Sequence, residues 1–341
     1  MKINYTPPWW LGHGLVQTLY IALWHSSRWE QTLTLPEPPY QEHIFVGAEG
    51  VPIYGWIAIP ERAHSTIVAT YGITGSLENQ GILRVLGRKA FAQGFAVVLF
   101  DWRAHGQTAL LSPTLTSDGL YEGLDFVQIG MQAKHRGCPA PFWFSGYSLG
   151  GQLALWGVNA AAEQGWLDLG GAAVLCPNLD SNRSLTYLTS SYLGRQLEAA
   201  ITRALKQLAW EIDRAHPGVL DPAAIARANS IAGFDRELVI ERLGFASVTD
   251  YYHASSPLPL LPQLRYPTLI LYAADDPLFD PTLVTDLQIA SKLNRKVDLH
   301  LTAQGGHVGY LSSSRCQLQR GDEDGWWAWN QILQWCRTYS R

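Results

Sequence analysis

Charge of either sign is scarce in this chain of 341 residues. Charged side chains make up 16% of it, against 47% for hydrophobic ones, and 25 basic and 29 acidic residues leave a net charge of −4. This balance provides no basic surface for phosphate backbones, so we expect no nucleic-acid partner. The hydrophobic share is large enough for a substantial buried core.

Cysteine and cofactor signatures are equally sparse. The four cysteines form no C-x-x-C pair, and we expect buried free thiols in a cytoplasmic protein. The chain has no H-E-x-x-H motif, no cluster of Cys and His, no G-x-G-x-x-G and no P-loop. We therefore expect neither a metal nor a cofactor.

Long hydrophobic runs are also missing. The stretch from Trp9 to Trp24 is apolar, but glycines, His13 and Gln17 interrupt it, so it is too short and too polar to span a bilayer. We see no secretory signal, because an apolar segment with an A-x-A site is lacking. We expect residues 1–40 to pack on the core of a monomer, with peripheral contact to a membrane surface as the alternative.

What the chain does have is an alternation of strand and helix patterns. An alternating segment, Ile53–Ile59, is typical of an antiparallel strand, and compact apolar runs indicate strands buried on both faces. These runs are Thr66–Thr70, Ala96–Phe100, Phe142–Ser145, Ala172–Cys176, Thr268–Ala273 and Val297–Thr302. Helical spacing of apolar residues occurs at Leu77–Gln93, Asp118–His135, Leu149–Glu163, Pro281–Leu293 and Asp322–Cys336. The pattern predicts an α/β fold with a doubly wound, mostly parallel sheet.

The alternation fails once, between about residues 183 and 264. Apolar residues from Leu193 to Ile212 mark one long amphipathic helix, and shorter helical pieces follow Pro217 and Pro222. A helical insertion between two strands of such a sheet lies over the strand ends where ligands bind. We therefore predict a helical cap at 183–264, inserted in a core made of 41–182 and 265–341.

One motif carries the chemistry. Gly146-Tyr147-Ser148-Leu149-Gly150 lies between a predicted strand and a predicted helix. A G-x-S-x-G motif at this junction is a nucleophile elbow, in which a sharp turn exposes the serine hydroxyl above the sheet. We predict Ser148 as the nucleophile.

A serine nucleophile needs a base, and the base needs a carboxylate to orient it, in the chain order serine, acid, histidine. Asp276 follows the strand Thr268–Ala273, and His307 lies in a Gly-rich loop after Val297–Thr302. We predict these two residues as acid and base. Asp275 and Asp180 stay open as alternative acids, while His105 is expected to shape its loop rather than titrate.

Backbone N–H groups must also hold the developing oxyanion. One is expected from Leu149, directly after the nucleophile, and the other from Ile73 in the Gly-rich loop Tyr71–Ser76. An ordinary tight turn is the alternative interpretation of this loop.

These residues resemble a known family, the YheT-like branch of the α/β-hydrolases. Pro7-Pro8-Trp9-Trp10-Leu11 and Gly14–Thr18 are similar to its N-terminal entry, and Gly146–Gly151, Ala274–Pro277 and Gly305–Gly309 to its elbow, acid and histidine loops. The resemblance implies cleavage of short-chain esters or monoacylglycerol-like lipids by Ser148, Asp276 and His307. Two loops depart from it: Tyr71-Gly72 replaces the usual His-Gly, and Arg103-Ala104-His105-Gly106 replaces an Arg-Gly-Cys type loop.

The expected function is therefore that of a serine esterase whose partner is a small ester or lipid substrate. The same triad could instead cleave an amide, thioester or carbon–carbon bond, because a fold does not fix the reaction. A non-catalytic binding protein with the same fold is the third alternative.

Overall fold

A single eight-stranded sheet organises the chain. The computed structural model describes residues 5–25 and 27–340, so residues 1–4 of the predicted extension and Arg341 lie outside the described part. The strand order is β1-β2-β4-β3-β5-β6-β7-β8, and all pairs are parallel except β1–β2 and β2–β4. The strands are β1 (Gln41–Val46), β2 (Pro52–Ala58), β3 (Ser65–Thr70), β4 (Phe95–Phe100), β5 (Phe142–Tyr147), β6 (Leu169–Leu175), β7 (Thr268–Ala273) and β8 (Val297–Thr302). The predicted fold class is confirmed.

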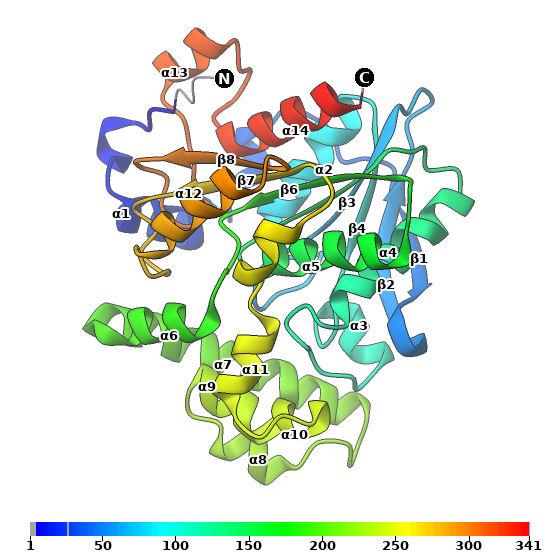
Figure 1. Ribbon diagram of the computed structural model, residues 1–341, viewed down its shortest axis with the longest axis vertical. Helices are drawn as coiled ribbons and strands as arrows, with labels where there is room; N and C mark the ends of the chain where they lie inside the picture. The colour runs from blue at the N-terminus through cyan, green and yellow to red at the C-terminus, as the bar shows by residue number, and fades with distance from the viewer. Residues whose placement is uncertain (1–4, 26, 341) are drawn as a thin grey trace.

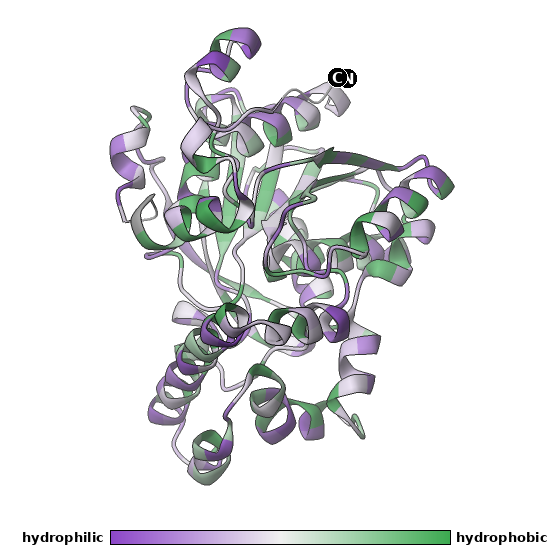
Figure 2. Ribbon diagram, turned by 90° about the vertical axis from the view of Figure 1, so that its left-hand side faces the viewer, coloured by the Kyte–Doolittle hydropathy of each residue, from purple (hydrophilic) through white to green (hydrophobic). Residues whose placement is uncertain are grey.

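Helices cover both faces of the sheet (Figure 1). On one face α2 contacts α14, and on the other α4 packs along α5. The helices of the sheet layers are α2 (Gly81–Ala92), α3 (Gly106–Leu111), α4 (Glu122–His135), α5 (Leu149–Gln164), α12 (Leu283–Leu293), α13 (Ser314–Arg320) and α14 (Trp327–Tyr339). Figure 2 shows hydrophobic strands between helices whose outer faces are hydrophilic.

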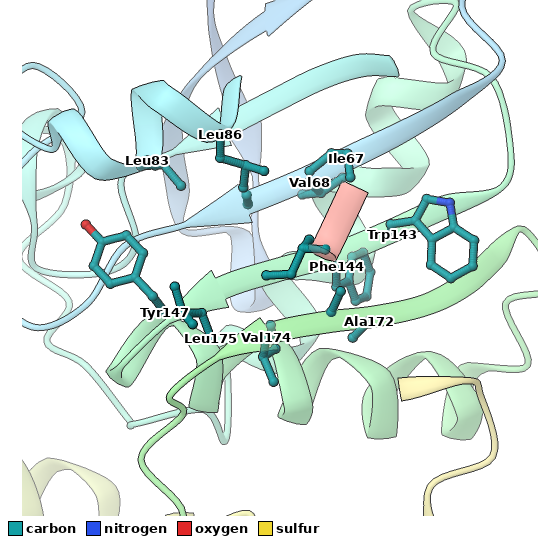
Figure 3. Close-up of a cluster of buried hydrophobic side chains, with 14 of the residues drawn as sticks. Ile67, Val68, Leu83, Leu86, Trp143, Phe144, Tyr147, Ala172, Val174 and Leu175 are labelled. Carbon is teal, nitrogen blue, oxygen red and sulfur yellow. The ribbon is translucent and has the colours of Figure 1, made fainter. Parts of the chain in front are cut away.

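The core lies where these layers meet. β3 and β4 are buried at every position, as are β5 and β7. Figure 3 shows Ile67, Phe144 and Val174 from neighbouring strands in one cluster, with Leu86 of α2 above them. Burial on both faces explains why these strands have compact apolar runs instead of alternation.

The segment between β6 and β7 is entirely helical. It gathers beyond one end of the sheet (Figure 1) and forms a second hydrophobic cluster, to which Ala104, Ala109 and Leu115 also contribute. Its elements are α6 (Ser181–Ser190), α7 (Tyr192–Ala215), α8 (Pro222–Arg227), α9 (Ile231–Phe234), η5 (Asp235–Val239), α10 (Ile240–Leu243), α11 (Val248–Ser255) and η6 (Leu258–Gln263). The amphipathic pattern from Leu193 to Ile212 corresponds to α7, and α6 begins two residues before the predicted boundary at 183.

Several predicted helix starts were too early. The helices predicted from Leu77, Asp118, Pro281 and Asp322 begin at Gly81, Glu122, Leu283 and Trp327. The preceding residues have other roles. Leu77 N–H donates to a buried aspartate, and Asp118 has a φ of +50°, outside the helical region. No strand was predicted for β1, because it is an edge strand in which only Phe45 is buried and it lacks a compact apolar run.

The N-terminal segment has two different sides. It forms η1 (Trp9–Leu11), α1 (Gly14–Tyr20), η2 (Ile21–His25) and η3 (Trp29–Thr32). Leu11 and Gln17 are fully buried, whereas the Trp9 side chain is 92% exposed. In the described part of the chain, no helix combines the length and the apolar character that crossing a membrane requires.

Candidate active site

Ser148 occupies a strained turn between β5 and α5. Its φ of +55° lies in the left-handed region, which a side-chain-bearing residue enters only when its surroundings enforce it. A Cβ atom at Gly146 would lie 2.4 Å from the Gly150 carbonyl oxygen, and one at Gly150 would lie 2.3 Å from the Tyr71 carbonyl oxygen. The two glycines of the motif are therefore required by close backbone contact.

The structure brings Ser148, His307 and Asp276 into one hydrogen-bonded chain. His307 Nε2 lies 2.9 Å from Ser148 Oγ, and His307 Nδ1 lies 2.8 Å from Asp276 Oδ2. An ionised carboxylate only accepts, so we assign the imidazole proton to Nδ1. Nε2 is then free to accept the Ser148 proton, as a general base must.

The Asp276 carboxylate is enclosed and fixed in direction. Its side chain is 2% exposed, and its Oδ1 accepts the Leu278 N–H at 2.9 Å. The edge-on ring of Phe279 lies 4.9 Å from the His307 ring, centroid to centroid. Asp276 and His307 are thus held by the loops that follow β7 and β8.

The alternative acids face other partners. Asp275 Oδ1 accepts the Gly306 N–H at 2.9 Å, and Asp180 caps α6 by accepting the Arg183 N–H at 3.1 Å. Asp280, a third acidic residue near this loop, accepts the Thr282 N–H at 2.8 Å. Asp276 is the carboxylate hydrogen-bonded to His307.

The two predicted oxyanion donors, Ile73 and Leu149, border the same cavity as Ser148. Leu149 is the first residue of α5, so its N–H has no acceptor within the helix. The loop carrying Ile73 passes close to the nucleophile, since a Cβ at Gly72 would lie 3.0 Å from Ser148 Cβ.

A buried carboxylate, Asp101, ties the Ile73 loop in place. It accepts hydrogen bonds from the Tyr71 hydroxyl at 2.6 Å and from the backbone N–H groups of Leu77 at 2.8 Å and Gln107 at 2.9 Å. Burial raises the pKa of Asp101 to about 6 against the opposing effect of these donors. Tyr71, the departure from the family pattern, is thus a structural partner of Asp101.

His105 holds the same loop from the other side. Its Nε2 lies 3.1 Å from Thr74 N, and its Nδ1 lies 2.9 Å from the Arg103 carbonyl oxygen. Complete burial lowers the pKa of His105 to about 4, so the ring is neutral and can accept from Thr74 while donating to Arg103. His105 also stacks on Trp102, with ring centroids 3.6 Å apart.

A cavity lies between the nucleophile and the helices that follow β6. Much of its wall is apolar and comes from α6, α7 and α9, through Leu185, Leu188, Ile201, Leu205, Ile231 and Phe234. An apolar cavity with a few polar groups is the usual form of a small-molecule site. Ser148 therefore borders a cavity that is suited to an apolar group.

Two carboxyl groups interrupt this apolar wall, and sequence reasoning missed both. Asp118 comes from the loop before α4, and Asp235 begins η5 and accepts from the Tyr252 hydroxyl. Burial and the nearby Asp235 raise the pKa of Asp118, and burial raises that of Asp235 to about 7. The chain has 29 acidic residues, and no local motif marks Asp118 and Asp235 as a pair.

Cys176 also lies beside Asp276 and His307. Its Sγ, one Asp276 oxygen and one His307 nitrogen lie within 4.8 Å of one another, which is close enough to bind a metal ion. Burial raises the pKa of the Cys176 thiol. The other two members of this set, Asp276 and His307, are already hydrogen-bonded to each other at 2.8 Å, and we assign them to that interaction.

The chain belongs to the α/β-hydrolase family. Residues 80–316 match the model of the family described as "Alpha/beta hydrolase family", a range that includes Ser148, Asp276 and His307. Within that family it belongs to the YheT-like branch: it is 30% identical to the Escherichia coli protein named "Putative esterase YheT", over 83% of this chain and 80% of the other.

Two further relatives also match over most of the length of both chains. The chain is 53% identical to a Synechocystis protein named "Putative esterase slr0264", over 97% of this chain and 94% of the other. It is 27% identical to mouse "Phospholipase ABHD3", over 87% of this chain and 74% of the other.

Proposed function

We propose that this protein is a serine esterase that acts through Ser148, His307 and Asp276. The observation that carries the proposal is the continuous chain from Ser148 Oγ through both His307 nitrogens to Asp276 Oδ2, with steps of 2.9 and 2.8 Å. The names of the esterase relatives support the same reaction class.

In the first half-reaction, His307 Nε2 takes the Ser148 proton as Oγ attacks the ester carbonyl carbon. The carbonyl oxygen becomes an oxyanion, which the N–H groups of Ile73 and Leu149 stabilise. The charged imidazole is stabilised by Asp276 and then protonates the departing alcohol, leaving an acyl-enzyme.

In the second half-reaction, water replaces the alcohol. His307 removes a proton from that water as it attacks the acyl carbonyl, and the oxyanion forms again at the same donors. When this tetrahedral intermediate collapses, the bond between the acyl carbon and Oγ breaks. His307 returns the proton to Ser148, and the carboxylic acid is released.

We further propose that residues 183–264 act as a cap that selects the acyl group. The apolar side chains of α6, α7 and α9 in the cavity wall support an aliphatic acyl chain, in a short-chain ester or a monoacylglycerol-type lipid. The phospholipase name of one relative is compatible with such a lipid substrate. Apolar contacts from these three helices favour an apolar substrate, because each buried CH₂ contributes about 0.8 kcal/mol.

The test is hydrolysis of p-nitrophenyl esters of increasing acyl length by the wild type and by Ser148→Ala. We expect the wild type to turn over, with a preference for acyl length, and the variant to lose activity while its circular dichroism spectrum is unchanged. A fluorophosphonate should label wild-type Ser148. An unlabelled wild type without activity on any ester would instead favour the non-catalytic binding protein.

A further inference from the structure

The N-terminal segment reaches into the catalytic centre. The hydroxyl of Thr18, in α1, accepts the backbone N–H of His307 at 2.7 Å, across 289 positions of sequence. The same hydroxyl donates to the Gly14 carbonyl oxygen at 2.8 Å. Its single proton is thereby committed to Gly14, so the oxygen that faces His307 can only accept.

The loop around His307 depends on such contacts for its shape. Gly305, Gly306, Val308 and Tyr310 all have positive φ, with +66° at Val308 and +44° at Tyr310. Side-chain-bearing residues pay for such conformations in free energy unless their surroundings hold them. The loop therefore needs external ties to keep the His307 backbone in one place.

α1 fits against this loop without spare room. A Cβ at Gly306 would lie 2.4 Å from the Gly14 carbonyl oxygen and 2.7 Å from Thr18 Oγ1. A Cβ at Gly14 would lie 2.0 Å from the Asp275 carbonyl oxygen. The first turn of α1 is thus wedged between the acid loop and the histidine loop.

We propose that Thr18 is a positioning residue for the reaction, which sets the backbone of His307 so that Nε2 meets Ser148 and Nδ1 meets Asp276. This inference rests on the proposed function. It assigns the N-terminal segment to the active site, although Thr18 itself touches no reacting atom.

The test compares Thr18→Val, which has nearly the same shape without the hydroxyl, with Thr18→Ser, which retains it. We expect kcat of Thr18→Val to fall roughly 10- to 100-fold with KM within about 2-fold, because a misplacement near 1 Å can cost that much in rate. Thr18→Ser should keep kcat within about 3-fold of the wild type, since it still accepts the His307 N–H.

Thr66→Val is the matched control. Thr66 is buried like Thr18, and its hydroxyl also donates to a backbone carbonyl, that of Pro139, at 2.6 Å, but it lies at the start of β3, at the other end of that strand from the Ile73 loop. A general effect of losing a buried threonine hydroxyl would lower kcat equally in Thr18→Val and Thr66→Val, and that result would overturn the proposal. Equal kcat in Thr18→Val and Thr18→Ser would do the same.

Amide hydrogen exchange supplies a readout that does not depend on activity. The His307 amide should exchange slowly in the wild type and in Thr18→Ser, and at least 10-fold faster in Thr18→Val. If Thr18→Val does not fold, fast exchange of this amide in the wild type would still contradict the proposal. Labelling of Ser148 with unaltered kcat in Thr18→Val would reject the role of Thr18 and leave the proposed esterase intact.

Discussion

The hydroxyl of Tyr71 donates a 2.6 Å hydrogen bond to Oδ1 of Asp101 beneath the loop that carries Ile73. Asp101 is fully buried, and its ionised form is tolerated because several donors surround it. Removing one of those donors therefore affects both the stability of the fold and the geometry of the proposed oxyanion site.

We predict that Tyr71→Phe lowers the free energy of unfolding by about 1.5–3 kcal/mol at pH 8, the usual cost of a lost hydrogen bond to a charged group. The loss should be smaller at pH 5. With a folded pKa of about 6, Asp101 is protonated there and its bond to Tyr71 is no longer charge-assisted. Urea unfolding at the two pH values measures both.

Tyr266→Phe provides the comparison for this variant. Its hydroxyl donates to a neutral acceptor, the Trp166 carbonyl oxygen, at 2.8 Å. The cost of that substitution should not change between pH 5 and pH 8. If the two variants respond alike to pH, the Asp101 carboxylate is not what Tyr71 stabilises.

Asp276→Asn tests which carboxylate orients the base. An amide at this position can donate to Nδ1 and favour the wrong imidazole tautomer, so we expect kcat to fall about 10³- to 10⁴-fold. Asp275→Asn is the neighbouring control, because an amide oxygen there can still accept the Gly306 N–H. It should lose no more than about 10-fold in kcat. The measurement is the kcat of both variants on one p-nitrophenyl ester. A larger loss of kcat in Asp275→Asn than in Asp276→Asn would make Asp275 the carboxylate that orients His307.

Asp235 should make the protein less stable as the pH rises. Its folded pKa of about 7 exceeds the value of about 3.9 in an unfolded chain, so the folded state binds the proton more tightly. Its stabilising contribution is complete below about pH 4 and is lost as the pH rises to about 7.

Asp235→Asn removes this titration while keeping an acceptor for the Tyr252 hydroxyl. We expect its melting temperature to fall less than that of the wild type between pH 4.5 and pH 8. Asp250→Asn, at an exposed carboxylate in α11, should follow the wild-type curve. Parallel curves for wild type and Asp235→Asn would show that Asp235 is ionised in both states.

Gly150→Ala should disrupt the elbow. In an ordinary helix position this change stabilises by about 1 kcal/mol. Here the new Cβ would lie 2.3 Å from the Tyr71 carbonyl oxygen, so backbone must move. We expect a loss of several kcal/mol or of soluble protein, from the overpacking and displaced backbone. Gly325→Ala, where the nearest atom is 3.5 Å away, should melt within a few degrees of the wild type.

Much of this organisation could be predicted from local sequence. Buried strands such as β3 and β7 are continuous apolar runs, so their positions were predicted to within a residue. The chain order of Ser148, Asp276 and His307 was informative for the same reason, because each residue lies in the turn or loop that follows a recognisable strand. The fold therefore fixes their approximate placement.

Features that depend on distant contacts could not be predicted. β1 has one buried residue, and its place is set by pairing with β2. Asp118 and Asp235 meet in the cavity although they come from different parts of the fold, and each has an ordinary local sequence. Thr18 falls within a motif of the YheT-like family, but only the folded chain places it against His307.

The hydrogen bond between Thr18 and His307 also has a consequence for biosynthesis. The two residues are separated by 289 positions, so a ribosome making about 5–20 residues per second completes the second one roughly 15–60 s after the first. Throughout that interval α1 lacks the complete histidine loop against which it packs in the folded protein. The nascent chain would therefore contain the proposed nucleophile, Ser148, before it contained the proposed base, His307, and the proposed esterase activity would be among the last properties acquired during translation.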